Sequence, residues 1–441
     1  MILHGTSFVD GNGHLVIGGV DAVKLAKEYG TPLIVYDVAL IRQKINELKQ
    51  AFESHGIQYQ IAYASKAFSC IGILQLMKEE NVSLDVVSGG ELYTALKAEF
   101  PPERIHFHGN NKSLAEIEMA VKAGIGCFVV DNFHELTLLD QAAKAYNTTI
   151  SVLIRTTPGI EAETHDYILT GQEDSKFGFD LKSGQADQAI QQILANPNLR
   201  LLGLHCHIGS QIFETTGFVL AVQRLYEYIS IWKEKFGFSP QVLNVGGGFG
   251  IRYTKEDQPL PLANYVHDIV KAVREEAEKI NCELPEIWIE PGRSLVGDAG
   301  TTLYTIGSEK DIPSIRHYVA VDGGMADNIR PALYGAKYEA ILANRANENA
   351  SGVYSIAGKC CESGDMLIWD CPLPKPNPGD ILAVFSTGAY GYAMSNNYNR
   401  IPRPAVVFVE NGESQLVIKR ETYEDLVSHD LPYKNVYEWR K

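Results

Sequence analysis

The sequence lacks a long apolar run. No stretch of its 441 residues approaches the roughly 20 consecutive apolar residues that a bilayer-crossing helix needs. Residues 1–30 mix polar residues with glycine and contain no apolar core of a secretory signal. We therefore expect no membrane span, no secretory signal and a cytoplasmic location.

Positive charge is also scarce. The chain has 39 Lys and Arg against 54 Asp and Glu, which gives a formal net charge of −15. This excess repels phosphate backbones and anionic membranes, and no Lys/Arg run is interleaved with aromatic residues. Nucleic acid and membranes are therefore not expected as partners, and we expect a small-molecule substrate.

The cysteines follow neither a disulfide nor a zinc pattern. There are seven, an odd number, and no C-x-x-C pair occurs. This distribution is typical of a reducing compartment. The triplet His205-Cys206-His207 could place two imidazoles on one strand face, as in a metal site, but no third and fourth ligand is evident. We predict no metal.

Eight short, strand-like runs alternate with amphipathic helical stretches before residue 300. The runs are residues 60–63, 83–87, 105–108, 127–130, 151–154, 201–205, 242–245 and 287–289. Between them, Ser113 and Glu116 form a capping box with Gly124 as a helix stop. Residues 263–280 carry an apolar face at helical spacing, on Tyr265, Ile269, Val273 and Ala277.

This alternation predicts an α/β class with a parallel (β/α)8 TIM barrel over residues 35–300. Later runs lose the helical period and indicate strands at 317–321, 352–356, 366–369, 381–385, 405–409 and 415–419. Residues 15–18 also read as a strand and could join them. We therefore predict a second, discontinuous all-β domain, barrel- or sandwich-like, from residues 1–34 and 301–441.

Unusual residues follow each of the eight predicted barrel strands, where barrel active sites form. They are Lys66, Ser88-Gly89-Gly90, His108-Gly109-Asn110, Asp131-Asn132, Arg155, His207-Ile208-Gly209-Ser210, Gly246-Gly247-Gly248 and Glu290-Pro291-Gly292-Arg293. Stability alone would not require a marked residue at every strand end. We therefore expect the active site at this face.

Three of these signals suit one cofactor chemistry: an amine at Lys66, a glycine cradle at 246–248 and a carboxylate at Glu290. Together they fit an aldehyde cofactor with a phosphate and a ring nitrogen, and Ser210 adds a donor. Simpler readings stay open, namely a solvated lysine, a flexible turn and a loop salt bridge between Glu290 and Arg293. Likewise, His207 is either a core histidine or a ring stacked on a planar cofactor, and Cys361 either a buried thiol or a proton donor.

The motifs around these residues closely resemble the diaminopimelate decarboxylases, a fold-type III, alanine-racemase-like group of pyridoxal-phosphate decarboxylases. They are Tyr63-Ala64-Ser65-Lys66-Ala67, His207-Ile208-Gly209-Ser210-Gln211, Gly246-Gly247-Gly248-Phe249-Gly250, Glu290-Pro291-Gly292-Arg293, Cys361-Glu362-Ser363-Gly364-Asp365 and Gly388-Ala389-Tyr390-Gly391. The match runs in order over nearly the whole chain. It is most similar to the Bacillus-type bacterial members.

The resemblance implies a pyridoxal 5'-phosphate cofactor held covalently by Lys66. Glu290 would pair with the pyridine nitrogen, and His207 would stack on the ring. Asp85 and Arg155 would lie near Lys66 and the ring. The phosphate would be held by a set of loops, comprising Ser210, Gly246, Gly247, Gly248, the turn Glu290-Pro291-Gly292-Arg293, and Tyr390.

The resemblance also implies a substrate site and a homodimer. Arg293, Arg330 and Tyr334, with Tyr390, would bind the distal carboxylate of the substrate. Glu362 would take its distal ammonium, and Cys361 would return a proton to the reacting carbon. In this family Cys361 and Glu362 would reach the active site from the partner subunit.

The implied reaction is removal of the D-centre carboxylate of meso-2,6-diaminopimelate, giving L-lysine and CO2 in the last step of lysine biosynthesis. Two arginines, Arg293 and Arg330, suit a second carboxylate, because arginine grips that group through two hydrogen bonds. The alternatives are a related decarboxylase of ornithine, arginine or carboxynorspermidine, a racemase, and a non-catalytic regulator that kept the fold. A barrel enzyme that uses a phosphorylated sugar without pyridoxal is a further one.

Overall fold

The computed structural model describes residues 3–160 and 175–433. These residues form two compact units. Unit 1 comprises the described residues up to Thr6, Asp37–Gly300 and Phe385–Ala393, and unit 2 comprises Ser7–Tyr36, Thr301–Val384 and the described residues from Met394 onward. The assignment of 35–300 to one domain, and of 1–34 with 301–441 to the other, stays a prediction.

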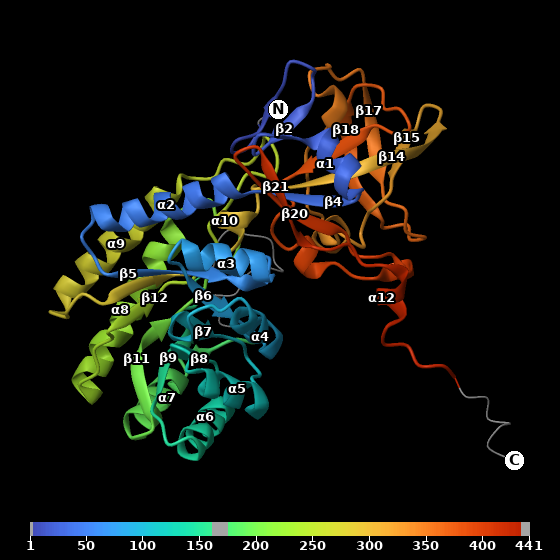
Figure 1. The fold of residues 1–441 in the computed structure, drawn as a ribbon. Coiled ribbons are helices and arrows are strands. Elements are labelled where there is room, and N and C mark those ends of the chain that lie inside the picture. The colour runs from blue at the N-terminus through green and yellow to red at the C-terminus, as the bar shows by residue number, and fades with distance from the viewer. Residues whose placement is uncertain (1–2, 161–174, 434–441) are drawn as a thin grey trace, which may run out of the picture. The chain divides into compact units, whose positions relative to one another are not determined.

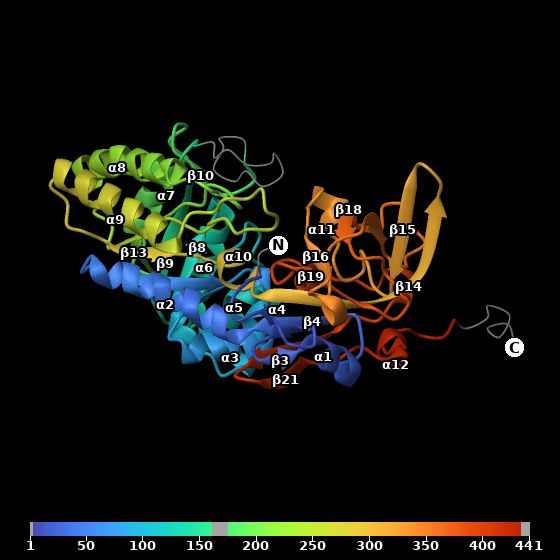
Figure 2. The same cartoon turned by 90° about the horizontal axis from the view of Figure 1, so that it is seen from above.

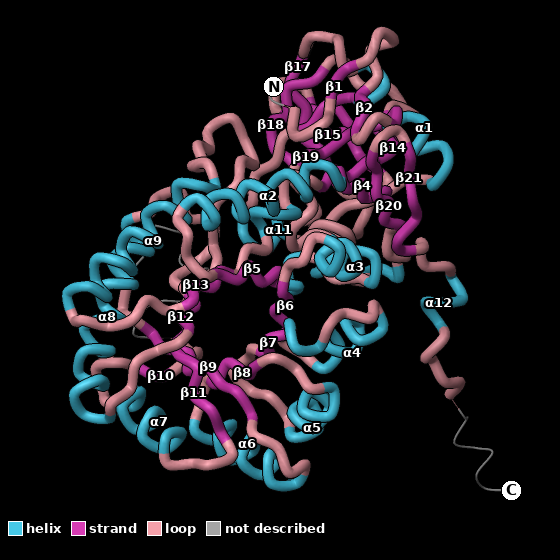
Figure 3. The backbone as a smooth tube through the Cα atoms, turned by 60° about the vertical axis from the view of Figure 1, so that its left-hand side comes forward, coloured by secondary structure: helices cyan, strands magenta, loops and turns pink. Residues whose placement is uncertain are grey.

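Unit 1 contains a closed ring of eight parallel strands (Figure 3). They are β5 (Tyr59–Ala64), β6 (Ser83–Val86), β7 (Ile105–Phe107), β8 (Cys127–Val130), β9 (Ile150–Thr157), β11 (Leu199–His205), β12 (Val242–Asn244) and β13 (Glu286–Ile289). The pairing of β13 with β5 closes the ring, and the short β10 (Phe179–Asp180) pairs with β9 outside it. The predicted TIM barrel is confirmed.

Helices surround this ring (Figure 1). They are α2 (Val38–Ser54), α3 (Ile71–Glu79), α4 (Gly89–Lys97), α5 (Leu114–Ala123), α6 (Phe133–Ala145), α7 (Gln185–Leu194), α8 (Thr216–Phe236) and α9 (Leu262–Lys279), with a short α10 (Arg293–Val296) after β13. Neighbours along the ring, such as α8 and α9, lie side by side (Figure 2).

Local sequence signals explain where these helices begin and which side they bury. The Ser113 side chain accepts from the Glu116 N–H in a full capping box, and α5 ends at Gly124 with φ of 74°. In α9, Tyr265, Ile269 and Val273 are buried, as their spacing predicts. Both predictions are confirmed.

The barrel interior is packed in layers, with the polar layer nearest the carboxyl ends of the strands. His106 of β7 stacks on Trp288 of β13, with ring centroids 4.3 Å apart and planes 7° apart. Because side chains two residues apart on a strand share a face, His108 and Glu290 occupy the next layer up. The buried polar groups therefore converge at the face that carries the active site in such barrels.

Unit 2 is rich in β-strands. A nine-stranded sheet has the order β18-β17-β15-β14-β4-β20-β21, with β19 beside β14 and β16 beside β19. Its strands are β4 (Leu33–Asp37), β14 (Gly300–Ile312), β15 (Arg316–Val321), β16 (Ala340–Leu342), β17 (Gly352–Ala357), β18 (Met366–Leu373), β19 (Ile381–Phe385), β20 (Ala405–Glu410) and β21 (Glu413–Ile418). Three short strands form an antiparallel sheet of their own: β1 (Phe8–Val9), β2 (Leu15–Ile17) and β3 (Val20–Asp21). Short helices are α1 (Ala22–Tyr29), α11 (Arg330–Tyr334) and α12 (Tyr423–Val427).

The predicted second β domain is confirmed, with two differences in detail. Residues 15–18 do contain a strand, β2, but it pairs with β1 and β3 rather than in the large sheet. The strand from the first forty residues that enters the large sheet is β4, which is buried along its whole length. Such a run has no alternation, so its period does not distinguish strand from buried helix. Within the described ranges, no helix combines the length and apolarity needed to cross a membrane.

Candidate active site

A cavity in unit 1 gathers residues from the carboxyl ends of several barrel strands. Its lining consists of Ala64, Lys66, Asp85, His207, Ser210, Gly248, Phe249, Glu290, Gly292, Arg293, Ser294 and Tyr390. Most of the residues that the sequence assigned to a cofactor therefore surround one space. Ala64, Phe249 and Ser294 are lining residues that sequence reasoning did not assign to the site.

Lys66 lies on a 3-10 turn, Ser65–Ala67, directly after β5. Backbone hydrogen bonds hold both ends of this turn. The N–H of Ala64 donates to the carbonyl of Pro291 (3.1 Å), and the N–H of Tyr390 donates to the carbonyl of Ala67 (2.8 Å). The exposed Lys66 side chain therefore lines the cavity from a fixed backbone.

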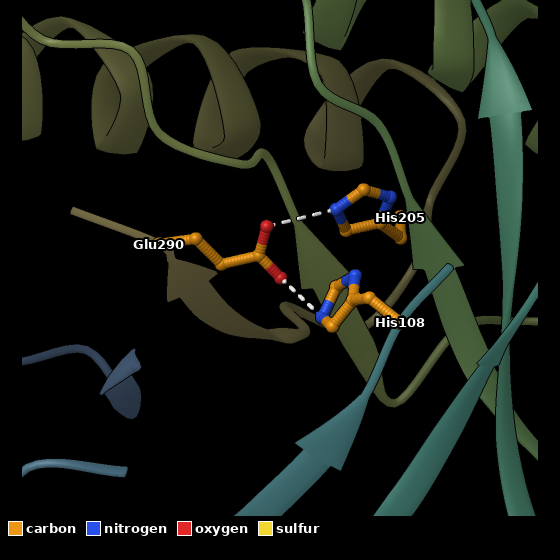
Figure 4. A group of neighbouring side chains, drawn as sticks. All are labelled: His108, His205 and Glu290. Carbon is orange, nitrogen blue, oxygen red and sulfur yellow. Dashed lines mark hydrogen bonds and ion pairs between the residues drawn. The ribbon is translucent and has the colours of Figure 1, made fainter. Parts of the chain in front are cut away.

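Glu290 follows β13 and is the centre of a buried polar cluster (Figure 4). Its Oε2 lies 2.9 Å from Nε2 of His205, and its Oε1 lies 3.0 Å from Nε2 of His108. The side-chain amide of Asn244 donates to Oε1 (2.7 Å). Burial alone raises the pKa of Glu290, but His108 and His205 outweigh it, and the pKa lies well below its usual value.

Sequence reasoning missed this supporting role of His108, His205 and Asn244. All three lie at the end of a barrel strand, and that position is the signal that could have found them. The His205-Cys206-His207 triplet does not converge as two ligands. His205 contacts Glu290, whereas Nδ1 of His207 accepts from the N–H of Gly247 (3.3 Å).

Asp85 of β6 is a second buried acid beside this cluster. Its Oδ1 lies 3.6 Å from Nε2 of His108. Burial raises the pKa of Asp85 to about 7. Glu290 adds to this rise, whereas His108 and Lys66 oppose it. The two carboxyl groups therefore differ in charge near neutral pH, because Glu290 stays ionised while Asp85 exchanges its proton.

The glycine loop after β12 fits between two neighbouring loops only because it has no side chains. A Cβ on Gly247 would lie 2.0 Å from the carbonyl oxygen of Glu290, and one on Gly248 would lie 2.2 Å from that of Gly209. Gly246 and Gly248 also have positive φ, at 73° and 102°. The backbone of this loop is therefore part of the cavity wall.

Arg293 brings a buried guanidinium to the same cavity. Its Nη2 donates to Oγ of Ser210 (2.9 Å), its Nη1 donates to the Tyr253 hydroxyl, and its centre lies 4.9 Å from the Tyr390 ring centroid. In the described part of the chain, Nε of Arg293 and Oγ of Ser294 are buried without a hydrogen-bond partner. Unsatisfied donors beside a glycine loop are what a bound phosphate would satisfy.

Arg155 requires a correction. It lies inside β9, which runs on to Thr157, rather than after a strand, and it is not among the lining residues. Its guanidinium lies 4.3 Å from the Phe177 ring centroid. Burial lowers the pKa of Arg155, and nearby acids including Glu290 partly offset this decrease. Arg155 thus acts on the cluster through its charge. Gly246, Gly247 and Pro291 flank the cavity through backbone contacts.

The four remaining candidates belong to unit 2. Arg330 begins α11, is buried and donates from Nη1 to the Tyr338 hydroxyl (2.6 Å), whereas Tyr334 is exposed. Cys361 and Glu362 are exposed in the loop between β17 and β18. None of the four is among the residues that line the unit 1 cavity in the described chain.

Comparison with known proteins identifies close relatives. The family model described as "Pyridoxal-dependent decarboxylase, pyridoxal binding domain" matches residues 38–297. The chain is 66% identical over 432 residues to a diaminopimelate decarboxylase of Halalkalibacterium halodurans, with 98% of each chain covered. It is 64% identical over 434 residues to that of Bacillus subtilis, with 98% and 99% covered.

A solved structure supports the same likeness. The diaminopimelate decarboxylase from M. jannaschii in co-complex with L-lysine aligns with a TM-score of 0.91 at 36% identity, covering 97% of this chain and 98% of that one. Similarity over almost the entire length means that both units are shared.

The raised pKa of Asp85 predicts a pH dependence of stability. Between its ordinary value of 3.8 and about 7 the folded chain holds a proton that the unfolded chain has released, so this group makes the fold less stable as pH rises. We therefore expect the urea concentration at the unfolding midpoint to fall less steeply between about pH 5 and about pH 7 in Asp85→Asn than in the unsubstituted chain, measured without added cofactor. Glu278→Gln, at an exposed position of α9, is the control. An identical pH slope in Asp85→Asn and the unsubstituted chain would contradict the assignment.

Proposed function

The chain belongs to the diaminopimelate decarboxylase family of pyridoxal-dependent decarboxylases, and on this premise we propose that it converts meso-2,6-diaminopimelate to L-lysine and CO2. The carboxylate leaves from the D-centre, and the reaction is the last step of lysine biosynthesis. The observation that carries the proposal is the unit 1 cavity, which combines an amine, an ionised carboxylate and a glycine cradle with unsatisfied donors.

Pyridoxal 5'-phosphate fits this cavity. Lys66 would hold it covalently, Glu290 would face its ring nitrogen and His207 would lie against the ring. Ring-nitrogen pairing suits Glu290, because its pKa lies well below its usual value and the carboxylate stays charged. When bound, the cofactor takes up the electron pair that the substrate carbon keeps as CO2 departs. A full electron sink of this kind favours a decarboxylase over a racemase.

The phosphate would occupy the space between the glycine loop, Ser210, the turn at 290–293 and Tyr390. The close backbone approach of Gly247 and Gly248 leaves no side chain in the way. Arg293 supplies positive charge, and its unpartnered Nε supplies a donor. Asp85 and Arg155 would adjust the charge near Lys66 and the ring rather than contact the phosphate.

The substrate groups far from the reacting carbon would be bound by Arg293, Arg330, Tyr334 and Tyr390 for the carboxylate, and by Glu362 for the ammonium. Arg330 is buried, and its Nη1 donates to the Tyr338 hydroxyl. A buried arginine without its carboxylate costs a few kcal/mol. This penalty disfavours ornithine, arginine and carboxynorspermidine as substrates.

The proton that replaces CO2 would come from Sγ of Cys361. Cys361 is exposed in the described chain, and with Glu362 it is absent from the cavity lining. Both facts suit a homodimer in which each partner supplies this loop to the other's site. All seven cysteines are free thiols, which supports a cytoplasmic location. The proposal keeps residues 35–300 as the cofactor-binding domain and 1–34 with 301–441 as the β domain.

The decisive experiment measures CO2 and lysine release by purified protein with added pyridoxal phosphate. The substrates are meso-diaminopimelate, ornithine, arginine and carboxynorspermidine. Lysine formed from diaminopimelate, with no turnover of the others, is expected. Turnover of another member of the panel would overturn the substrate assignment and keep the cofactor. No turnover of any, with the cofactor bound, would favour a non-catalytic regulator. A protein that stays colourless with the cofactor would favour a barrel enzyme without pyridoxal.

Lys66→Ala should abolish lysine formation, because no other amine lines the cavity of the described chain to hold the cofactor. It should also remove the absorbance of covalently bound cofactor while the far-ultraviolet circular dichroism stays unchanged. Lys97→Ala, at an exposed position of α4, is the matched control and should retain both. Full activity in Lys66→Ala would refute the covalent role.

Arg330→Ala should raise the KM for diaminopimelate by roughly tenfold or more, because a charge-assisted, two-bond contact to the distal carboxylate is lost. Steady-state kinetics measure it, and Arg224→Ala on α8 serves as a surface arginine control. An unchanged KM in Arg330→Ala would remove this residue from the substrate site.

A further inference from the structure

Three polar side chains, His108, His205 and Asn244, contact the Glu290 carboxylate. Resting on the proposed function, we propose that His108 and His205 are positioning residues that keep the Glu290 carboxylate ionised and aimed at the cofactor ring. Their role is exerted through Glu290, and neither histidine lines the cavity.

The geometry of the three residues carries this inference. His108 follows β7, His205 ends β11 and Glu290 follows β13, so three separate strands of the ring supply them. Figure 4 shows both imidazoles turning Nε2 toward the carboxylate, one to each oxygen. The distances are 2.9 Å from His205 to Oε2 and 3.0 Å from His108 to Oε1. With the Asn244 amide on Oε1 (2.7 Å), contacts on both oxygens fix the plane of the carboxylate.

Burial makes these contacts necessary. The exposed fraction is 5% for His108, 0% for His205 and 7% for Glu290. A buried carboxylate retains its charge only where hydrogen bonds and charges replace the lost water. Burial lowers the pKa of His205, so its neutral ring carries the proton on Nε2 and donates it to Glu290.

His108 has a second neighbour that explains its position. Its Nε2 lies between Oε1 of Glu290 and Oδ1 of Asp85, at 3.0 and 3.6 Å. Without a ring there, two buried acids would repel each other and compete for one proton. Other charged groups that act on this cluster are Lys66, Arg155 and Glu91, of which Glu91 raises the pKa of Asp85 further. His108 thus keeps Glu290 as the charged acid, and Asp85 as the one that takes up a proton.

A purely structural role is the competing reading, and the same barrel supplies a control for it. His106 is also fully buried on β7, two residues before His108, and it stacks on Trp288. No hydrogen bond or ion pair of the described structure joins His106 to Glu290. Loss of His106 should therefore reduce stability without changing how Glu290 titrates.

The experiment replaces each histidine by leucine and by glutamine and follows the bound cofactor by absorbance across a pH series. Leucine removes the imidazole. In His108→Leu and His205→Leu, the pH at which the cofactor absorbance is half changed should therefore fall by about one unit or more. They should also weaken cofactor binding to the apoprotein by roughly tenfold. Glutamine offers an N–H donor, so His205→Gln and His108→Gln should restore most of both. His106→Leu should shift neither.

A double-mutant cycle keeps the test decisive. In a Glu290→Gln background, His205→Leu and His108→Leu should cause no further absorbance shift, because their effect passes through the carboxylate. Unchanged midpoints and cofactor Kd in the folded leucine variants would overturn the proposal. If a leucine variant does not fold, His205→Gln is compared with His205→Asn, whose shorter amide does not reach Glu290. A midpoint shift in His205→Gln as large as that in His205→Asn would overturn the proposal. A chain that binds the cofactor but forms no lysine would refute the proposed function alone.

Discussion

The buried charge of Glu290 is the interaction on which the site depends. A carboxylate at the mouth of a barrel, cut off from water, keeps its charge only when the surrounding strands supply donors. Here His205 of β11 and Asn244 of β12 hydrogen-bond the carboxylate, and His108 after β7 lies within ion-pair distance of it. Because these strands are far apart in sequence, the closed ring is a precondition for the chemistry. For Asp85, whose Oδ1 is 3.6 Å from His108, burial outweighs the nearby positive charge and raises the pKa to about 7.

The remainder of the cavity is built by close backbone approach. Glycines at 247 and 248 let the loop after β12 contact the backbone at Glu290 and Gly209, which leaves space for an anion. On the other side, the Lys66 turn is held by backbone bonds to Pro291 and Tyr390. One wall thus supplies an amine and the other supplies donors. Both walls use rigid strand ends, which limits the movement of groups that must face one small cofactor.

The β-rich unit 2 has a different relation to the chemistry. Its candidate residues lie on α11 and in the loop between β17 and β18, and three of them, Tyr334, Cys361 and Glu362, are exposed in the described chain. Arg330 is already buried against Tyr338. The residues that line the described cavity therefore all belong to unit 1.

By itself the sequence determined the class of the protein. The regular alternation of strand-like runs with helical stretches predicted the barrel, because the apolar residues of a helix repeat with period 3.6. The positions directly after predicted strands singled out Lys66 and Glu290. Motifs in order along the chain identified the family. Only the tertiary structure decided which groups surround Glu290, because His108, His205 and Asn244 meet through ring closure and no local pattern records that contact. It also placed β4 in the nine-stranded sheet, between strands from the far end of the sequence, and it placed Arg155 inside β9. Pairing partners and strand ends depend on packing across the fold, so the local sequence does not determine them.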